Sequence, residues 1–212
     1  MQIVFSRHGN TFAPGDRVVW VGAETDLPLV ASGVAQAEAA ARALVRADLI
    51  PEIVYCGPLR RTRGYAEIVV AKILGAGLGG GIEIRVDPRL NEVRYGPWAG
   101  LTSQEIEENL GQGRQLAAWS QADIWPHDAG WLTTEAEVLA NVTDFAADIV
   151  QRHGDSRVLV ISSNGTLRYF PRLAPESLTL PSSQMKTGYL GLMTHKDGTY
   201  RLDRWNIGPE TL

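Results

Sequence analysis

The sequence predicts an α/β fold, a three-layer α/β/α sandwich whose sheet is mostly parallel with an antiparallel edge. Short apolar runs typical of strands alternate with longer stretches whose apolar residues recur at helical spacing. One of these runs, RVLVIS at 157–162, is typical of a buried strand. Near the C-terminus, the Asp197-Gly198 pair between two strand-like runs indicates a hairpin, and hence an antiparallel edge.

The first half of the chain predicts three strands with two helices between them. Residues 2–6 form the first expected strand. The helix after it has Ser32 as its expected N-cap and an apolar face at Val34, Ala37, Ala41 and Leu44. The next expected elements are a strand at Glu52–Cys56, a helix around Thr62–Leu74 and a strand at 82–86.

Residues 95–133 interrupt this alternation. They carry Trp98, Trp119, Trp125 and Trp131 among Gly, Pro and polar residues. One interpretation is an insertion or lid over a pocket, and the other is an excursion that its tryptophans pack onto the core. The sequence alone favours neither.

The regular alternation resumes after this excursion. Thr134 and Glu137 have the spacing of a capping box, and an apolar face follows at Val138, Val142, Phe145 and Ile149. After the strand at 157–162, a helix is expected from Gly165 onward, and the last strands are expected at 188–194 and 199–205.

Composition indicates one domain, residues 1–212, in a reducing environment. Hydrophobic residues make up 44% of the 212 residues, and the net charge of −4 argues against nucleic acid or an acidic membrane surface as a partner. No run is long enough to span a bilayer, and no signal peptide precedes the first strand. A single cysteine, Cys56, forms no internal disulfide, so we expect a cytoplasmic protein. The oligomeric state stays open, a homodimer included.

Three motifs suggest other chemistries, and each departs from its pattern. GAGLGGG at 75–81 follows a helix and precedes a strand, the reverse of a dinucleotide-binding loop. Cys56 is followed five residues later by an arginine, whereas cysteine phosphatases place the pair one residue further apart. Ser163 has Ile161 where a nucleophile elbow needs its first glycine.

Polar and cationic side chains follow three of the expected strands at the points where those strands end. Arg7 and His8 follow the first strand, Arg60 and Arg61 follow the second, and Ser163 with Asn164 follows the strand at 157–162. Ligands of open α/β sheets bind outside the carboxyl ends of the strands, where helix starts offer free amides to a phosphate. The sequence therefore predicts a phosphate site at this edge, with Glu92 near enough to supply a proton.

These motifs resemble those of the histidine phosphatase superfamily, the phosphoglycerate mutase-like proteins. RHGNT at 7–11 is similar to the opening signature of that family. Four further segments follow in the family's order: 24–44, YCGPLRRTRGYAEIV, LNEVRYGPWAGLT and VLVISSNGTLR. The likeness spans nearly the whole chain and implies a phosphoglycerate mutase-like fold.

The resemblance implies a role for each of these residues. His8 would attack phosphorus and become a phosphohistidine, and Glu92 would protonate the leaving oxygen. Arg7 and Arg61 would neutralise the phosphoryl oxygens, with Ser163 and Asn164 completing the phosphate site. No metal or other cofactor is required. Looser expectations for substrate contacts are Asn10, Thr11, Arg17, Trp20, Arg94 and Tyr95.

The last motif departs from the family at its histidine. The family usually reads Ser-His-Gly-Gly with an arginine five residues after the histidine. Counted back from Arg168, Ser163 stands at the histidine position and Asn164 at the next glycine. Either side chain can donate a hydrogen bond, but neither carries charge. His127, in the excursion, is a further candidate to approach the site.

We therefore expect a phosphomonoester hydrolase that acts on a small phosphorylated metabolite, such as a sugar phosphate. A catalytically impaired relative that binds a phosphorylated ligand or partner is the alternative, motivated by the altered last motif. A phosphomutase is the third hypothesis. The chain is short for a cofactor-dependent mutase, and Glu92 has no evident use in a protein that only binds phosphate.

Overall fold

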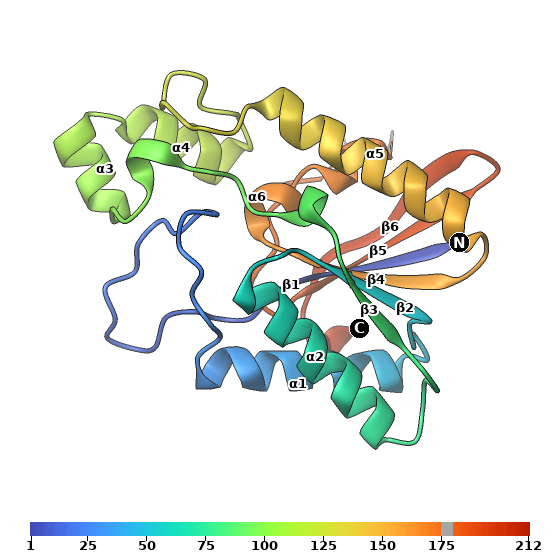
Figure 1. The fold of residues 1–212 in the computed structure, drawn as a ribbon. Coiled ribbons are helices and arrows are strands. Elements are labelled where there is room, and N and C mark those ends of the chain that lie inside the picture. The colour runs from blue at the N-terminus through green and yellow to red at the C-terminus, as the bar shows by residue number, and fades with distance from the viewer. Residues whose placement is uncertain (175–179) are drawn as a thin grey trace.

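The computed structural model describes residues 1–174 and 180–212, and its strands form one mixed sheet (Figure 1). The strands are β1 (Gln2–Arg7), β2 (Ile53–Cys56), β3 (Glu83–Val86), β4 (Arg157–Ser162), β5 (Leu190–Lys196) and β6 (Thr199–Ile207). Their order is β3-β2-β4-β1-β5-β6; the first four are mutually parallel, and β5 and β6 run antiparallel to their neighbours. The predicted mostly parallel sheet with an antiparallel edge is confirmed.

Helices cover both faces of the sheet (Figure 1). Two of them, α1 (Ala31–Arg46) and α2 (Arg60–Gly75), pack on one face, and α5 (Glu135–His153) packs on the other. Beyond the end of β1 lie α3 (Ser103–Leu110) and α4 (Gly113–Ala122), while the short α6 (Asn164–Leu167) directly follows β4. Within the described ranges, no helix combines the length and the apolar character needed to cross a membrane.

Successive side chains of the central strands contribute alternately to two hydrophobic cores, one on each face of the sheet. In β1, Ile3 and Phe5 join the core under α5, whereas Val4 joins the core under α1 and α2. Successive strand residues point to opposite faces, and here both faces are covered, so the run is apolar throughout. The central strands are thereby fixed, and their carboxyl ends are held in a constant relative position.

Two predicted helix starts have different outcomes. The capping box at α5 is confirmed: the Glu137 amide donates to Thr134 Oγ1 at 3.2 Å, and the Glu137 carboxylate accepts from the Thr134 amide at 2.6 Å. The prediction that Ser32 caps α1 is wrong, because the helix begins at Ala31 with Val30 in the cap position. The Ser32 hydroxyl instead accepts from Asn10 Nδ2 at 3.3 Å and so helps hold the loop that follows β1.

The helix expected from Gly165 onward is only one turn long. It ends as α6 at Leu167, and a 3₁₀ turn at Phe170–Leu173 follows. Pro171 lacks a backbone N–H and cannot continue an α-helix. The α-helical path after β4 therefore ends within one turn.

The tryptophan-rich segment 95–133 is joined to the core under α5. Trp98, Trp119 and Trp125 are buried, and Trp131 meets each of them edge to face at centroid distances of 4.9 to 5.2 Å. Such contacts add to the stabilisation that area burial alone provides. The tryptophans thus pack α3 and α4 onto the body of the protein, on the side of the strand carboxyl ends.

Candidate active site

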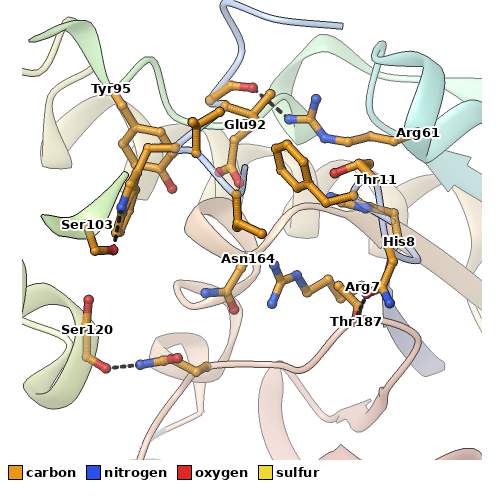
Figure 2. A pocket seen from close by; sticks show the side chains of 18 of the residues that line it. Arg7, His8, Thr11, Arg61, Glu92, Tyr95, Ser103, Ser120, Asn164 and Thr187 are labelled. Carbon is orange, nitrogen blue, oxygen red and sulfur yellow. Dashed lines mark hydrogen bonds between the residues drawn. The ribbon is translucent and has the colours of Figure 1, made fainter. Parts of the chain in front are cut away.

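A cavity of about 600 Å³ lies at the carboxyl ends of the parallel strands. Figure 2 shows Arg7, His8, Arg61, Glu92 and Asn164 around this hollow. Of the residues predicted as site residues, the cavity is lined by Arg7, His8, Asn10, Thr11, Trp20, Arg61, Glu92, Tyr95 and Asn164. The structure therefore brings together residues from loops that are far apart in the sequence.

His8 is buried at the base of the cavity with its ring orientation fixed. Its Nδ1 lies 2.7 Å from the carbonyl oxygen of Gly9. A carbonyl oxygen only accepts, so the ring proton is on Nδ1 and Nε2 keeps a free lone pair. Burial, followed by the charges of Arg61 and Arg7, holds the pKa of His8 well below its usual value. The imidazole is therefore neutral at neutral pH, as a nucleophile must be.

Gly9 lets the chain leave the strand at this position. A Cβ on Gly9 would lie 2.3 Å from the backbone oxygen of Gly33 in α1. Only a residue without a side chain permits that approach. The glycine of the RHGNT motif thus sets the position of His8 relative to the start of α1.

Two guanidinium groups lie beside His8 and are held by backbone carbonyls. Arg7 Nη1 donates to Met185 O at 2.8 Å. Arg61 is buried, and its two terminal nitrogens donate to Gly22 O at 2.7 Å and Thr25 O at 3.1 Å. Burial lowers the pKa of both arginines, but each remains charged, because arginine does not lose its proton in proteins. Two fixed cations beside a neutral histidine suit a phosphoryl group.

Glu92 enters the same hollow from the loop after the 3₁₀ turn at Pro88–Leu90. Its Oε1 accepts from the Val93 amide at 2.9 Å, and its Oε2 accepts from the Gly165 amide at 3.4 Å. Burial of the carboxyl group raises the pKa of Glu92, although the positive charges of Arg61 and Arg7 act to lower it. A carboxyl group with a raised pKa can carry a proton to a leaving oxygen.

The two residues of the altered last motif have different environments. Asn164 lines the cavity, and its Oδ1 accepts from the Met185 amide at 2.9 Å. Ser163 is buried, does not line the cavity, and its Oγ has no hydrogen-bond partner among the described residues. The structure therefore brings Asn164, and not Ser163, to the place predicted for both.

Arg168 lines the cavity, but it was not predicted as a site residue. In the sequence it served only as the position from which the last motif was aligned. It is buried, and its guanidinium lies 3.9 Å from the centre of the Trp119 ring. Nη1 donates to Trp119 O at 2.6 Å and lies 3.2 Å from the Asp123 carboxylate. The charge of Arg168 lowers the pKa of Arg7, as a neighbouring like charge does, so the two guanidinium groups are electrostatically coupled. Its position in the sequence could have indicated this role, because Arg168 comes one helical turn after Asn164, a predicted site residue at the end of β4.

Unpaired buried groups concentrate around this site. Of the five buried side-chain atoms without a hydrogen-bond partner in the described chain, Arg7 Nε and Arg168 Nε belong to residues that line the cavity, and Ser163 Oγ belongs to the neighbour of the lining residue Asn164. A fourth, Asp123 Oδ1, has its ion pair with Arg168. Buried polar atoms are normally paired, and exceptions mark functional regions. The cavity is thus the place where the fold leaves polar groups unsatisfied.

Two residues predicted as substrate contacts lie outside the cavity lining. Arg17 is exposed and pairs with Glu105, and its Nη1 also donates to Gly100 O at 3.1 Å. Arg94 is exposed and lines a separate hollow beside α5. In their place the cavity contains Phe12, Val18 and Val19 from the first loop, and Gln184 and Thr187 from the segment before β5.

The alternative nucleophiles and histidines are placed away from this chemistry. Burial raises the pKa of the Cys56 thiol to about 12, so Cys56 is not a thiolate nucleophile. His127 is exposed, 4.0 Å from the Glu135 carboxylate, and His153 contacts the Tyr55 hydroxyl at 2.8 Å. Neither lines the cavity, nor does His195. In residues 1–174 and 180–212 no group of three metal-ligating side chains is found.

Sequence and structural comparisons agree with this geometry. The family model of the histidine phosphatase superfamily (branch 1) matches residues 3–208, so the chain belongs to that superfamily. A 2,3-bisphosphoglycerate-dependent phosphoglycerate mutase of Bifidobacterium longum is 31% identical over 160 residues, which cover 68% of this chain and 62% of the mutase.

A phosphatase is similar to almost the whole chain both in sequence and in structure. A glucosyl-3-phosphoglycerate phosphatase of Mycobacterium tuberculosis is 27% identical over 217 residues, covering 99% of this chain and 88% of the relative. The solved structure of a mycobacterial glucosyl-3-phosphoglycerate phosphatase superimposes with a TM-score of 0.74 at 26% identity, covering 98% of this chain and 99% of the other. The fold and the superfamily are thus shown by independent comparisons.

Proposed function

We propose that the chain is a phosphomonoester hydrolase that acts on a small phosphorylated metabolite through a phosphohistidine on His8. One observation carries the proposal: the neutral imidazole of His8 presents a free Nε2 in a cavity that it shares with two anchored guanidinium groups. That arrangement provides a nucleophile together with charge neutralisation for the oxygens of a phosphoryl group. Its membership of the histidine phosphatase superfamily supports the same chemistry.

In the first step His8 Nε2 attacks phosphorus, and the bond from phosphorus to the ester oxygen breaks as the N–P bond forms. Glu92 gives its proton to the departing oxygen, so the alcohol leaves neutral. In the second step the Glu92 carboxylate takes a proton from water, and the water oxygen displaces His8 from phosphorus. Inorganic phosphate leaves, and the enzyme returns to its starting protonation.

Arg7 and Arg61 hold the phosphoryl oxygens in both steps. The family's second histidine is absent, and two neighbouring groups take over its contributions. Asn164 supplies a hydrogen-bond donor at the cavity wall, and Arg168 supplies positive charge from the same turn. Removing one charged donor from such a clamp typically costs about 10²–10³ in rate. We therefore expect Arg168 to be needed for turnover and Ser163 to be dispensable.

The alternative function is that of a protein that binds a phosphorylated ligand without turning it over. It is favoured by one observation, the missing second histidine at Ser163. Glu92 argues against it, since an unprotonated carboxylate in the hollow would repel the anion and a protonated one serves catalysis.

The absence of disulfide-forming cysteine pairs is compatible with a reducing compartment, and we assign the activity to the cytoplasm.

The experiment that tests the proposal is phosphate release from a panel of phosphomonoesters, including p-nitrophenyl phosphate. The wild type is compared with His8→Ala and with His127→Ala, which removes an exposed histidine outside the cavity. We expect release by the wild type and by His127→Ala, and none by His8→Ala. Saturable phosphate binding without release from any ester would instead support the binding protein.

A further inference from the structure

Charge is confined to one end of the cavity. Among the described lining residues, the charged or ionisable groups are Arg7, His8, Arg61, Glu92, Tyr95 and Arg168. Arg7, His8, Arg61 and Glu92 form the phosphoryl site together with Arg168, whose guanidinium also pairs with Asp123 at 3.2 Å. Arg17, a cation of the loop that follows β1, pairs with Glu105 and does not line the cavity. The rest of the cavity therefore offers no free cation to a second acidic group of a substrate.

The wall formed by the first loop is apolar and is not used by the fold. Phe12, Val18, Val19 and Val21 line the cavity, yet none of them belongs to either hydrophobic core of the described chain. Val18 is 63% exposed. Apolar side chains that gather at a cavity without packing in the core are available to cover apolar ligand surface.

Three pairs of polar groups that line the cavity are hydrogen-bonded to one another. Ser103 Oγ accepts from Trp20 Nε1 at 3.2 Å, and Thr187 Oγ1 donates to Asn10 Oδ1 at 2.6 Å. The side-chain amide of Gln184 donates to the backbone oxygen of Ser120. These pairs occupy part of the hydrogen-bonding capacity of the lining, and a ligand rich in hydroxyl groups would lose hydrogen bonds to water at each of them.

We propose that the preferred substrate is the phosphate monoester of an uncharged alcohol with a largely apolar body, bearing no second acidic group. The phosphate would lie at His8, and the apolar body would lie against the wall formed by Phe12, Val18 and Val19. This inference rests on the proposed function, and it replaces the sugar phosphate that the sequence led us to expect. It also separates this chain from relatives whose names contain phosphoglycerate, a compound that carries a carboxylate beside its phosphate.

The test compares three esters that all release a primary alcohol: 2-phenylethyl phosphate, glucose 6-phosphate and 3-phosphoglycerate. Because the leaving oxygens are alike, differences in kcat/KM report contacts with the remainder of each molecule. We expect kcat/KM for 2-phenylethyl phosphate to be about tenfold higher than for glucose 6-phosphate and about 10²-fold higher than for 3-phosphoglycerate. Differences of this size are in the range that unpaired polar groups produce. The reverse order would overturn the inference.

A charge placed on the apolar wall should change that preference. Val18→Arg adds a cation at an exposed position, and we expect kcat/KM for 3-phosphoglycerate to rise about tenfold, the upper range for an exposed ion pair that becomes partly desolvated. Leu139→Arg adds the same charge at an exposed position on α5 that does not line the cavity. This control should leave kcat/KM for 3-phosphoglycerate unchanged. Equal effects of both substitutions would contradict the assignment of the wall.

A binding experiment separates failure of this inference from failure of the proposed hydrolysis. Phosphonates have a carbon–phosphorus bond that this chemistry does not cleave, so their affinities do not depend on turnover. We expect the wild type to bind 3-phenylpropylphosphonate at least about tenfold more tightly than 3-phosphonopropionate. Equal or opposite affinities would refute the substrate class even in an active enzyme, and the expected order would support it even in a protein without activity.

Discussion

Replacing Gly165 with alanine tests the placement of the proposed general acid. A Cβ at this position would lie 2.3 Å from Glu92 Oε1, and also 2.9 Å from both the Tyr95 hydroxyl and Val93 Cγ2. Contacts of a real Cβ stay beyond 3.0 Å, so the carboxyl group has to retreat by at least about 0.7 Å. The backbone of α6 is not strained by alanine, so the substitution acts on its neighbours.

A shift of this size is enough to impair proton transfer. A misplacement near 1 Å costs about 10²-fold in rate, and the whole contribution of a general acid is about 10²–10⁴-fold. We therefore expect kcat/KM, which reports the steps up to release of the alcohol, to fall about 10²-fold in Gly165→Ala for the alkyl phosphate that the wild type hydrolyses fastest. For p-nitrophenyl phosphate the loss should be much smaller, because its leaving group departs without a proton. Overpacking should also cost about 1–3 kcal/mol of stability.

The assay measures kcat/KM for both esters in Gly165→Ala, Glu92→Gln and the double variant, with Tm recorded for each. The double variant should be no slower than Glu92→Gln, because the displaced group is already disabled. Gly64→Ala is the matched control: this glycine lies inside α2, and its added Cβ meets no atom within 4 Å. Wild-type rates in Gly165→Ala, or equal losses on both esters, would refute the assignment of Glu92.

Three further predictions concern the phosphate clamp, the cysteine and the nucleophile. Arg61→Met should weaken inhibition by vanadate about 10–10²-fold, while Arg17→Met, outside the cavity, should change it less than twofold; equal effects would contradict the clamp. Cys56→Ala should keep full activity, and iodoacetamide at pH 8 should not inactivate the native protein, because the pKa of the Cys56 thiol is about 12. Below pH 6.5 the unfolded chain protonates His8 while the folded protein resists it, so wild-type stability should fall by up to about 1.4 kcal/mol per pH unit relative to His8→Gln. A difference in Tm between these two proteins that stays constant from pH 7.5 to pH 5 would contradict the burial of a neutral His8.

The core of the site could be predicted from the sequence because parallel strands end at one edge. Arg7 is the last residue of β1, His8 directly follows it, and Arg61 lies beyond the end of β2 in the first turn of α2. Apolar strand patterns and the motif order were sufficient to place these residues together, and the cavity contains all three. The strength of this prediction comes from topology, since it needs no knowledge of any side-chain contact.

The remainder depended on contacts between distant segments. The segment before β5 reaches the site because its backbone pairs with Arg7: Gly188 N donates to Arg7 O at 3.0 Å, and Arg7 N donates to Tyr189 O at 3.2 Å. Nothing local in that segment indicates a cavity. Which of Ser163 and Asn164 faces the hollow depends on the exact end of β4, because a shift of one residue reverses the direction of a side chain.

The apolar wall was also beyond the reach of the sequence. Phe12 and Val18 belong to an irregular loop, and an apolar residue in a loop is as often packed in a core as exposed at a cavity. Arg17 illustrates the opposite error. It was a looser expectation for a substrate contact, but Glu105 in the first turn of α3 pairs with it. Such partners become evident only when the fold brings the two segments together.

The central claim is that His8 becomes covalently phosphorylated, and trapping that intermediate tests it most directly. The wild type is mixed with substrate, quenched in alkali within milliseconds, digested and analysed by mass spectrometry. We expect a phosphoryl group on the peptide that contains His8, stable in alkali and lost in acid, and absent from His8→Ala. Phosphate release without any phosphopeptide, or a phosphoryl group on another residue, would contradict the account.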